Sequence, residues 1–241
     1  MKKTALLLLT TVFAITVWAQ DKVYNDANAE KRSVSGFHAI SVGGGIDLQL
    51  TQGNEEAVAV SASKTEYRDK IKTVVENGVL KIFYETDNWR NWGWTGSSKK
   101  LKAYVSIKNI DGLKASGGSD VIINGTLNSA KLDLGLSGGS DFKGAVNITE
   151  LSGDLSGGSD LNISGRATNL TIEASGGSDV DGYELTVDNC TASCSGGSDI
   201  RITVNKELVA SASGGSDINY RGNATVKKKS SSGGSSVTKR G

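Results

Sequence analysis

Residues 116–120 read Ser116-Gly117-Gly118-Ser119-Asp120, and this pentapeptide recurs along the second half of the chain. Identical copies occupy residues 137–141, 156–160, 175–179, 195–199 and 213–217, and a seventh copy at 232–236 has Ser in place of Asp. Successive copies lie 18 to 21 residues apart. A period of this length is typical of repeat architectures.

Apolar and polar side chains alternate on both sides of each pentapeptide. The run Leu132-Leu134-Leu136 precedes the second copy, and the residues that directly follow the seven copies are Val121, Phe142, Leu161, Val180, Ile200, Ile218 and Val237. A period of two predicts strands with one buried face. About 19 residues is too short for a strand-helix-strand crossover but fits one coil of a parallel β-helix, whose coils stack about 4.8 Å apart.

A second glycine, at 125, 144, 165, 182 and 222, is expected to mark another corner in five coils. Earlier in the chain the alternation predicts shorter strands at 40–42, 46–50, 57–60, 79–84 and 101–107, with a helical turn only within 64–72. These strands are expected to continue or cap the coils at one end. Gly44-Gly45-Ile46-Asp47 is a weak echo of the pentapeptide. At the other end, Lys227 and Lys229 are expected to face inward, so the last coil should lie open as a charged stopper.

The N-terminus has the pattern of a secretory signal. Lys2 and Lys3 precede the apolar run 5–17, and small residues around Ala19 suit a signal peptidase, so residues 1–19 are expected to be removed. The run is too short for a transmembrane segment. We therefore expect an exported protein, in the periplasm, at the cell surface or outside the cell.

The charge balance argues against nucleic acid as a partner. The 241 residues contain 27 basic and 26 acidic side chains, and removal of the two signal lysines leaves a net charge of −1. No basic stripe is large enough to follow a phosphate backbone. The expected organisation is a polar leader without packed structure at 20–33, a β-helix domain at 34–226 with N-terminal strands (34–110) and pentapeptide coils (111–226), and a Lys-rich final coil or tail at 227–241.

The order of motifs resembles the putative auto-transporter adhesin, head GIN domain family over about residues 34–226. The motifs that carry the resemblance are residues 34–40, 44–53, 77–82 and 101–107, followed by the Ser-Gly-Gly-Ser-Asp coils. The resemblance implies an exported bacterial protein with a right-handed single-stranded parallel β-helix. Together with the periodicity, it predicts an all-β fold with coils of about 19 residues.

The pentapeptide aspartates are the sharpest candidate site: Asp120, Asp141, Asp160, Asp179, Asp199 and Asp217. Carboxylates stacked at coil spacing repel each other by about 0.9 kcal/mol in water. The simpler interpretation is that Asp and Ser oxygens cap the turn by accepting backbone N–H groups, while the two glycines adopt positive φ angles. The alternative is a column of bound Ca²⁺, as in the Gly-rich repeats of toxin β-rolls. No other cofactor is expected.

The same column allows an enzymatic hypothesis. Inverting glycosidases use two carboxylates about 6.5 to 9.5 Å apart, which alternate coils could supply. Such a pair needs unlike environments, whereas identical pentapeptides supply identical ones. The chain's single histidine, His38, lies far from the repeat and is expected to be a strand residue. We therefore predict no catalytic residues and no enzyme, with a β-helical carbohydrate-active enzyme as the alternative.

Cys190 and Cys194 are expected to be free thiols. Both fall on the inward face of one coil, in the columns of Leu170 and Ala174. Four residues along a strand cover about 13 Å, whereas a disulfide requires Cα atoms within about 7 Å.

The segment 87–96 holds three tryptophans, Trp89, Trp92 and Trp94, beside Arg90 and Asn91. Exposed indoles are costly to leave in water, so they are expected either to cover the edge of the cap or to form a platform that stacks on sugar rings. Such a platform predicts a glycan or a cell-surface or matrix protein as partner. The sequence as a whole predicts a non-catalytic, adhesin-like binding or structural module, with the enzyme and a Ca²⁺-binding β-roll-like module as alternatives.

Overall fold

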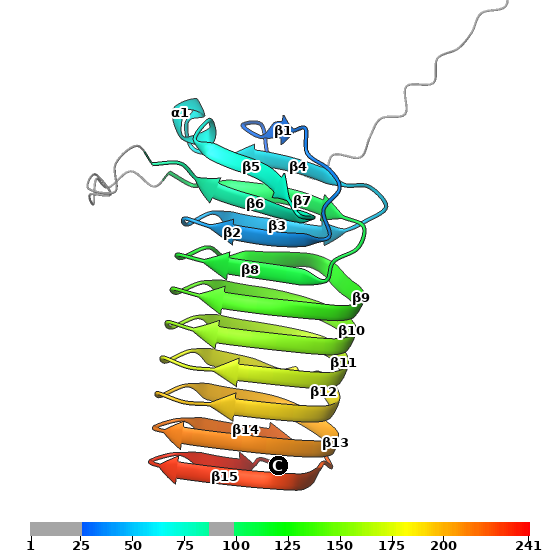
Figure 1. The fold of residues 1–241 in the computed structure, drawn as a ribbon, viewed down its shortest axis with the longest axis vertical. Helices are drawn as coiled ribbons and strands as arrows, with labels where there is room; N and C mark the ends of the chain where they lie inside the picture. Colours follow the sequence, from blue (N-terminus) through cyan, green and yellow to red (C-terminus); the bar gives the residue numbers. More distant parts are fainter. Residues whose placement is uncertain (1–25, 87–98) are drawn as a thin grey trace, which may run out of the picture.

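The computed structural model describes residues 26–86 and 99–241, which form a parallel β-solenoid of about seven turns (Figure 1). Five long strands make its middle: β9 (Val121–Ser137), β10 (Asp141–Ser156), β11 (Asp160–Ala174), β12 (Asp179–Cys194) and β13 (Asp199–Gly214). Each bends once from one face of the solenoid to the other, and the pentapeptide returns the chain to the first face (Figure 1). The predicted all-β coil architecture is confirmed.

The register between coils places equivalent residues of the repeat beside each other. Asp141 pairs with Asp160, Phe142 with Leu161, and Leu155 with Ala174. Inward and outward positions therefore stack in columns along the solenoid, because a parallel pair in this register keeps side-chain parity from strand to strand. The pentapeptide turns form the left edge of the molecule in Figure 1.

The N-terminal strands continue both faces and then close them. Their bounds are β1 (Glu30–Arg32), β2 (Ala39–Gly43), β3 (Asp47–Gln52), β4 (Ala57–Ser61), β5 (Ile71–Glu76), β6 (Val79–Tyr84), β7 (Lys102–Ile107) and β8 (Gly112–Ser116). One face runs β1-β4-β7-β3-β9 and the other β5-β6-β2-β8-β9. Strands β2, β3, β6, β7 and β8 join in parallel, whereas β1, β4 and β5 add antiparallel pairings at the end.

The only helix in the described ranges, α1 (Thr65–Arg68), has four residues and stands over this cap. No helix of these ranges is long and apolar enough to cross a membrane.

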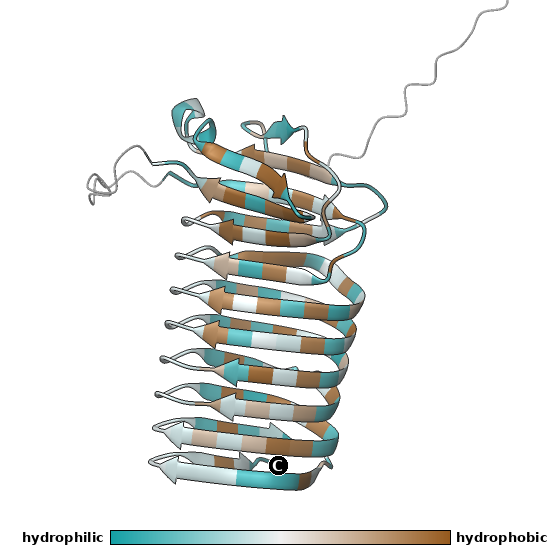
Figure 2. Cartoon of the chain, in the orientation of Figure 1, coloured by the Kyte–Doolittle hydropathy of each residue, from teal (hydrophilic) through white to brown (hydrophobic). Residues whose placement is uncertain are grey.

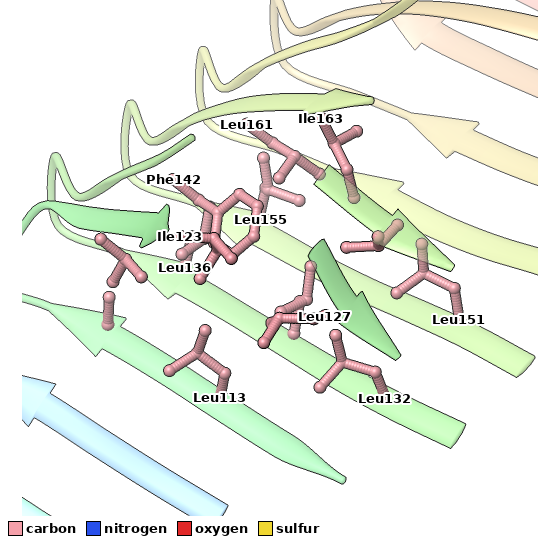
Figure 3. Packing of buried hydrophobic residues seen from close by; sticks show 14 of the residues in the cluster. Leu113, Ile123, Leu127, Leu132, Leu136, Phe142, Leu151, Leu155, Leu161 and Ile163 are labelled. Carbon is pink, nitrogen blue, oxygen red and sulfur yellow. The ribbon is translucent and has the colours of Figure 1, made fainter. Parts of the chain in front are cut away.

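The core is a continuous stack of aliphatic side chains between the two faces. Figure 3 shows Phe142 and Leu161 of one face pointing toward Leu136 and Leu155 of the other, with Leu127 farther along the first face. Each of these five side chains is at most 3% exposed. Side chains along each strand point alternately inward and outward, which is visible as bands of colour in Figure 2. Because the coils are in register, these positions form alternating buried and outward-facing columns.

Three parts of the cap and corners differ from the expectation. Residues 30–32, within the polar leader, form β1, because pairing with β4 satisfies backbone groups that β4 would otherwise expose at the sheet edge. Strand β5 was not predicted; it forms a hairpin with β6 through Asn77 and Gly78, both with positive φ angles. His38 lies one residue before β2 rather than within a strand.

Two of the predicted corner glycines do not form a corner. Gly125, Gly165 and Gly222 have φ angles of 94°, 104° and 95°, as a sharp corner requires. Gly144 and Gly182 are instead strand residues in inward columns. A Cβ on Gly182 would lie 2.8 Å from Ile202 Cδ1, and one on Gly144 would collide with Ile123. At these two positions glycine makes room for an isoleucine side chain of an adjacent coil.

The last turn is built by β14 (Asp217–Arg221), β15 (Thr225–Gly233) and β16 (Ser236–Lys239). Lys229 pairs with the inward-facing Ala210, as expected for a polar residue in the core column. Lys227 does not occupy such a column, because the register shifts by one residue between Leu208 and Val209 and leaves it unpaired in β15. Its ammonium group instead contacts Glu207 Oε1 at 3.1 Å.

The two cysteines are free and buried, in register with Leu170 and Ala174 of the preceding coil. Burial raises the pKa of the Cys190 thiol to about 12 and that of Cys194 to about 11. Because the thiolate is the reactive form, both side chains should be inert in the folded protein at neutral pH.

We expect an aromatic disulfide reagent at pH 8 to find no fast-reacting thiol in the native protein and two thiols in denaturant without reductant. Thr191→Cys supplies the control, because Thr191 is exposed between the two cysteines: this variant should show one fast thiol when native and three when denatured. A fast reaction of the native wild type would contradict the assigned burial.

Candidate functional site

The fourth residue of each of the six identical pentapeptides is a serine with no exposed surface, and it links neighbouring coils. The backbone N–H of Ser140 donates to Ser159 Oγ at 3.4 Å, that of Ser159 to Ser178 Oγ at 3.2 Å, and the contact repeats onward to Ser216. The hydroxyl of Ser159 in turn donates to the carbonyl of Ser156 at 2.9 Å. We call this chain of contacts the serine ladder; its members are Ser119, Ser140, Ser159, Ser178, Ser198 and Ser216.

The turn therefore depends on the serine more than on the aspartate that follows it. In the first five copies both glycines adopt positive φ angles as expected, for example 66° at Gly138 and 73° at Gly139, whereas in the sixth copy only Gly214 does. The aspartate belongs to the outward-facing set of its strand, so its side chain lies on the outer surface of the solenoid. Only some aspartates accept a neighbouring N–H, as Asp217 Oδ1 does from Ser236 at 3.0 Å.

The aspartates form one outward column beside the turns, the aspartate column. It comprises Asp120, Asp141, Asp160, Asp179, Asp199 and Asp217, and the register extends it to Asp47 on β3. Burial, followed by the charges of Asp141 and Asp179, raises the pKa of Asp160 above its usual value. Burial and the charge of Asp120 raise the pKa of Asp47, against the lowering effect of Lys102. Like-charge repulsion is thus built into this edge.

Some of this repulsion is offset locally. Arg201 Nη2 lies 3.1 Å from Asp199 Oδ2, and the N–H of Asp199 donates to Asp179 Oδ1 at 3.3 Å. Within residues 26–86 and 99–241, no group of three or more carboxylate, imidazole or thiol side chains is arranged to hold a metal ion. A single file of carboxylates can still attract cations, so Ca²⁺ binding by the column stays a prediction.

A shallow groove follows the opposite corner of the solenoid. Its lining residues are Asn128, Ser129, Ala130, Asn147, Ile148, Thr149, Arg166 and Thr168, from three successive coils. Asn147 Nδ2 donates to Asn128 Oδ1 at 3.2 Å, and Arg166 lies next to Asn147 in the register. Arg166 is two-thirds exposed, and its nearest carboxylate, Asp188, is 4.0 Å away and lies closer to Lys206.

Amides, hydroxyls and a guanidinium group in one groove suit a polar ligand such as a sugar. Sequence reasoning missed this groove because the strand register shifts between β9 and β10, at Lys143/Ala145. Asn128 therefore stands eight residues after its pentapeptide aspartate and Asn147 only six. An alignment on the pentapeptides alone hides their contact.

The predicted tryptophan site, Trp89, Trp92 and Trp94 with Arg90 and Asn91, lies outside the described residues. The described residues nearest to it in sequence belong to the cap, where Lys99 Nζ lies 4.5 Å from the centre of the Tyr84 ring. His38 also lies toward this end, with Nδ1 2.8 Å from Asp111 Oδ1, and both side chains are about half exposed. A solvated pair of this kind lacks the water-excluded setting of a catalytic dyad.

We expect Ser159→Ala to destabilise the protein. The substitution leaves the buried N–H of Ser140 and the carbonyl of Ser156 without their partner, at a cost of about 1 to 3 kcal/mol. A lower thermal midpoint, by roughly 3 to 8 °C, should be seen by circular dichroism. Ser156→Ala is the matched control, because Ser156 is the exposed serine of the same pentapeptide. Equal effects of the two substitutions would contradict the ladder.

We expect Asp160→Asn to stabilise the protein at pH 7. The raised pKa means that the fold prefers the protonated carboxyl, so this preference favours the folded state below the usual Asp pKa and is lost as the pH rises through the folded pKa. A neutral amide should raise the thermal midpoint by roughly 2 °C at pH 7, with little difference at pH 3. Asp133→Asn is the control, because Lys131 pairs with Asp133 at 2.9 Å.

The same melting experiment tests Ca²⁺ binding. If the column binds Ca²⁺, millimolar Ca²⁺ should raise the thermal midpoint of the wild type relative to excess chelator, and Asp160→Asn should shrink that difference. An identical midpoint in chelator and in Ca²⁺ would contradict Ca²⁺ binding.

Comparison with solved structures shows the same fold in several bacterial proteins. A putative adhesin from Bacteroides fragilis is 20% identical with a TM-score of 0.79, over 88% of this chain and 96% of that chain. A putative lipid binding protein from Parabacteroides distasonis is 18% identical with a TM-score of 0.68, over 90% and 98%. A putative adhesin from Parabacteroides merdae is 16% identical with a TM-score of 0.65, over 88% and 95%.

No curated protein matches the chain. A family profile, in contrast, matches residues 36–224, which include the N-terminal strands from β2 onward and the pentapeptide coils through β14. With most of its length covered by that profile, the chain belongs to the family described as putative auto-transporter adhesin, head GIN domain.

Proposed function

We propose that this protein is a secreted or surface-associated, non-catalytic β-helix that acts as an adhesin-like binding or structural module. The observation that carries the proposal is the register of the coils, which repeats outward polar side chains at a fixed spacing along a rigid rod. A repeating surface can engage a repeating ligand through several weak contacts at once, which raises the overall affinity. The family membership supports the same class of function.

A ligand would have to bind on the outside of the rod. A void between the coils, lined by Leu134, Ile163 and Ile202 among others, has a volume of about 10 Å³. This volume accommodates about one water molecule, and the apolar lining gives water no partner. The packed coils around this void thus leave no room there for an acyl chain or a sugar.

The absence of catalysis is proposed from the sameness of the coils. An acid and a base in one glycosidase site need environments that separate their pKa values. In the aspartate column, Asp160 and Asp179 each have as neighbours the aspartates of the adjacent pentapeptide copies, which have the same sequence. His38 pairs with Asp111 at the cap rather than with the column.

Two surfaces are proposed to contact the ligand. The first is the tryptophan segment, with Trp89, Trp92 and Trp94 stacking on sugar rings and Arg90 and Asn91 bonding to hydroxyl groups. The second is the corner groove, where Asn147 and Arg166 offer donors on adjacent coils. A glycan or a glycosylated cell-surface or matrix protein fits both.

We expect residues 20–241 to bind a defined subset of a glycan and matrix-protein array. Trp92→Ala should weaken binding to the best hit at least fivefold with an unchanged thermal midpoint, because the indole contributes stacking area rather than core packing. Lys143→Ala, which removes an exposed cation outside the groove, is the control.

Other outcomes separate the alternatives. Loss of binding in Arg166→Ala with normal binding in Trp92→Ala would place the contact in the groove. A thermal midpoint lowered by several degrees in Trp92→Ala, with binding unchanged, would show that the segment covers the cap. Release of reducing ends from any array polysaccharide would contradict the non-catalytic assignment, and an array without hits would contradict the binding role.

A further inference from the structure

The charge of the solenoid is divided sharply along its length. Residues 115–220, which form the coils, contain 14 acidic and 5 basic side chains, a net charge of −9. Residues 221–241, which form most of the last turn, contain six basic side chains and no acidic one: Arg221, Lys227, Lys228, Lys229, Lys239 and Arg240. The seventh pentapeptide carries Ser236 where the others carry aspartate, so the aspartate column stops where the basic end begins.

Three of the six cations contact another side chain. Lys227 is paired with Glu207, Arg221 stacks on the Tyr183 ring at 3.9 Å, and Arg240 donates to Asn219 Oδ1 at 2.7 Å. Lys228, Lys229 and Lys239 are exposed, and within the part of the chain that the structure describes no carboxylate oxygen lies within 4.0 Å of their ammonium groups. Their charge is therefore available to a partner.

These lysines lie on the two strands that end the sheet. β15 pairs only with β13 and β16 only with β14, so one side of each strand has backbone N–H and C=O groups without a strand partner. β15 is nine residues long, about 30 Å when extended, and carries the exposed hydroxyls of Ser230, Ser231 and Ser232 beside the lysines. Figure 2 shows the hydrophilic stretch of β15 at this end of the molecule.

The side chains of this end indicate which kind of polyanion it could bind. A membrane surface would be favoured by exposed apolar side chains that insert between lipids, but the large exposed hydrophobic residues of the described ranges, Val74, Phe83 and Ile122, lie elsewhere. Single-stranded nucleic acid would be favoured by exposed aromatic rings, but Tyr220 is 8% exposed and Tyr183 is covered by Arg221. Ammonium groups, hydroxyls and free backbone donors together suit a chain of sugars that bear carboxylates.

We propose that the last turn of the solenoid, through Lys228, Lys229 and Lys239, is a docking surface for an acidic polysaccharide. The net charge of −9 on the coils repels the same polymer, so contact is confined to the end and the rod stands away from the polysaccharide. This inference deepens the proposed binding role by assigning one ligand class to one end. It leaves the tryptophan segment and the corner groove for a different ligand.

Binding of residues 20–241 to polygalacturonate, with uncharged dextran as the comparison polymer, tests the proposal. We expect binding to polygalacturonate only, weakening steeply as the NaCl concentration rises, because bound cations release counterions from a polyanion. The triple variant Lys228→Gln, Lys229→Gln and Lys239→Gln should weaken binding at least tenfold and flatten the salt dependence.

The matched control is Lys108→Gln, Lys114→Gln and Lys143→Gln, which removes the same charge from exposed positions elsewhere. This variant should lose less than threefold, and both triple variants should keep the wild-type thermal midpoint. Equal losses in the two variants would overturn the proposal in favour of a net-charge effect. So would tighter binding of the wild type to single-stranded DNA or to anionic vesicles than to polygalacturonate.

The test also separates this inference from the proposed function. Binding to another glycan on the array, but not to polygalacturonate, would overturn the inference and leave the binding role intact. The wild type could instead self-associate in sedimentation experiments without binding polygalacturonate. If the triple variant Lys228→Gln, Lys229→Gln and Lys239→Gln abolished that self-association, the last turn would contact the acidic coils of a second copy. This result would also overturn the inference.

Discussion

The buried serine of the pentapeptide is the constraint on which the solenoid depends, because it solves the problem of the tight turn. A turn of two glycines with positive φ angles directs backbone groups toward the interior, where water cannot satisfy them. Ser159 satisfies one group in its own coil, the carbonyl of Ser156, and one in the neighbouring coil, the N–H of Ser140. The same side chain thus closes one turn and sets its height relative to the previous one.

Stacking fixed by the serine has an electrostatic consequence. Once Ser140 and Ser159 are in register, the residues that follow them, Asp141 and Asp160, must also be in register. The carboxylates cannot separate without breaking the ladder, so their repulsion persists in the fold and adds to the effect of burial in raising the pKa of Asp160. The aspartate column is therefore a consequence of the turn that builds the solenoid. Any binding role of this column would come in addition to that structural origin.

The repeat made the coils predictable, whereas the ends and the corners depended on contacts that a single sequence does not display. The period of 18 to 21 residues and the alternation around Leu132-Leu134-Leu136 were sufficient for the strands, the core columns and the free cysteines. Gly144 and Gly182 were misassigned to a corner because glycine serves equally for a positive φ angle and for a large neighbour. Strand β1 was missed because it depends on pairing with the later strand β4, and the corner groove because the register shifts between β9 and β10.

The two ends of the solenoid protect their exposed sheet edges in different ways. At the N-terminal end, β1 and β5 add antiparallel pairings and α1 stands over the cap, so the core is covered by structure. At the other end, Lys229 enters an otherwise apolar column opposite Ala210, and the next inward position is Ser231. A further apolar coil could stack there only by burying an ammonium group, which is strongly unfavourable without a partner. The lysine therefore limits growth by like coils and leaves an edge that a polar or anionic partner can approach.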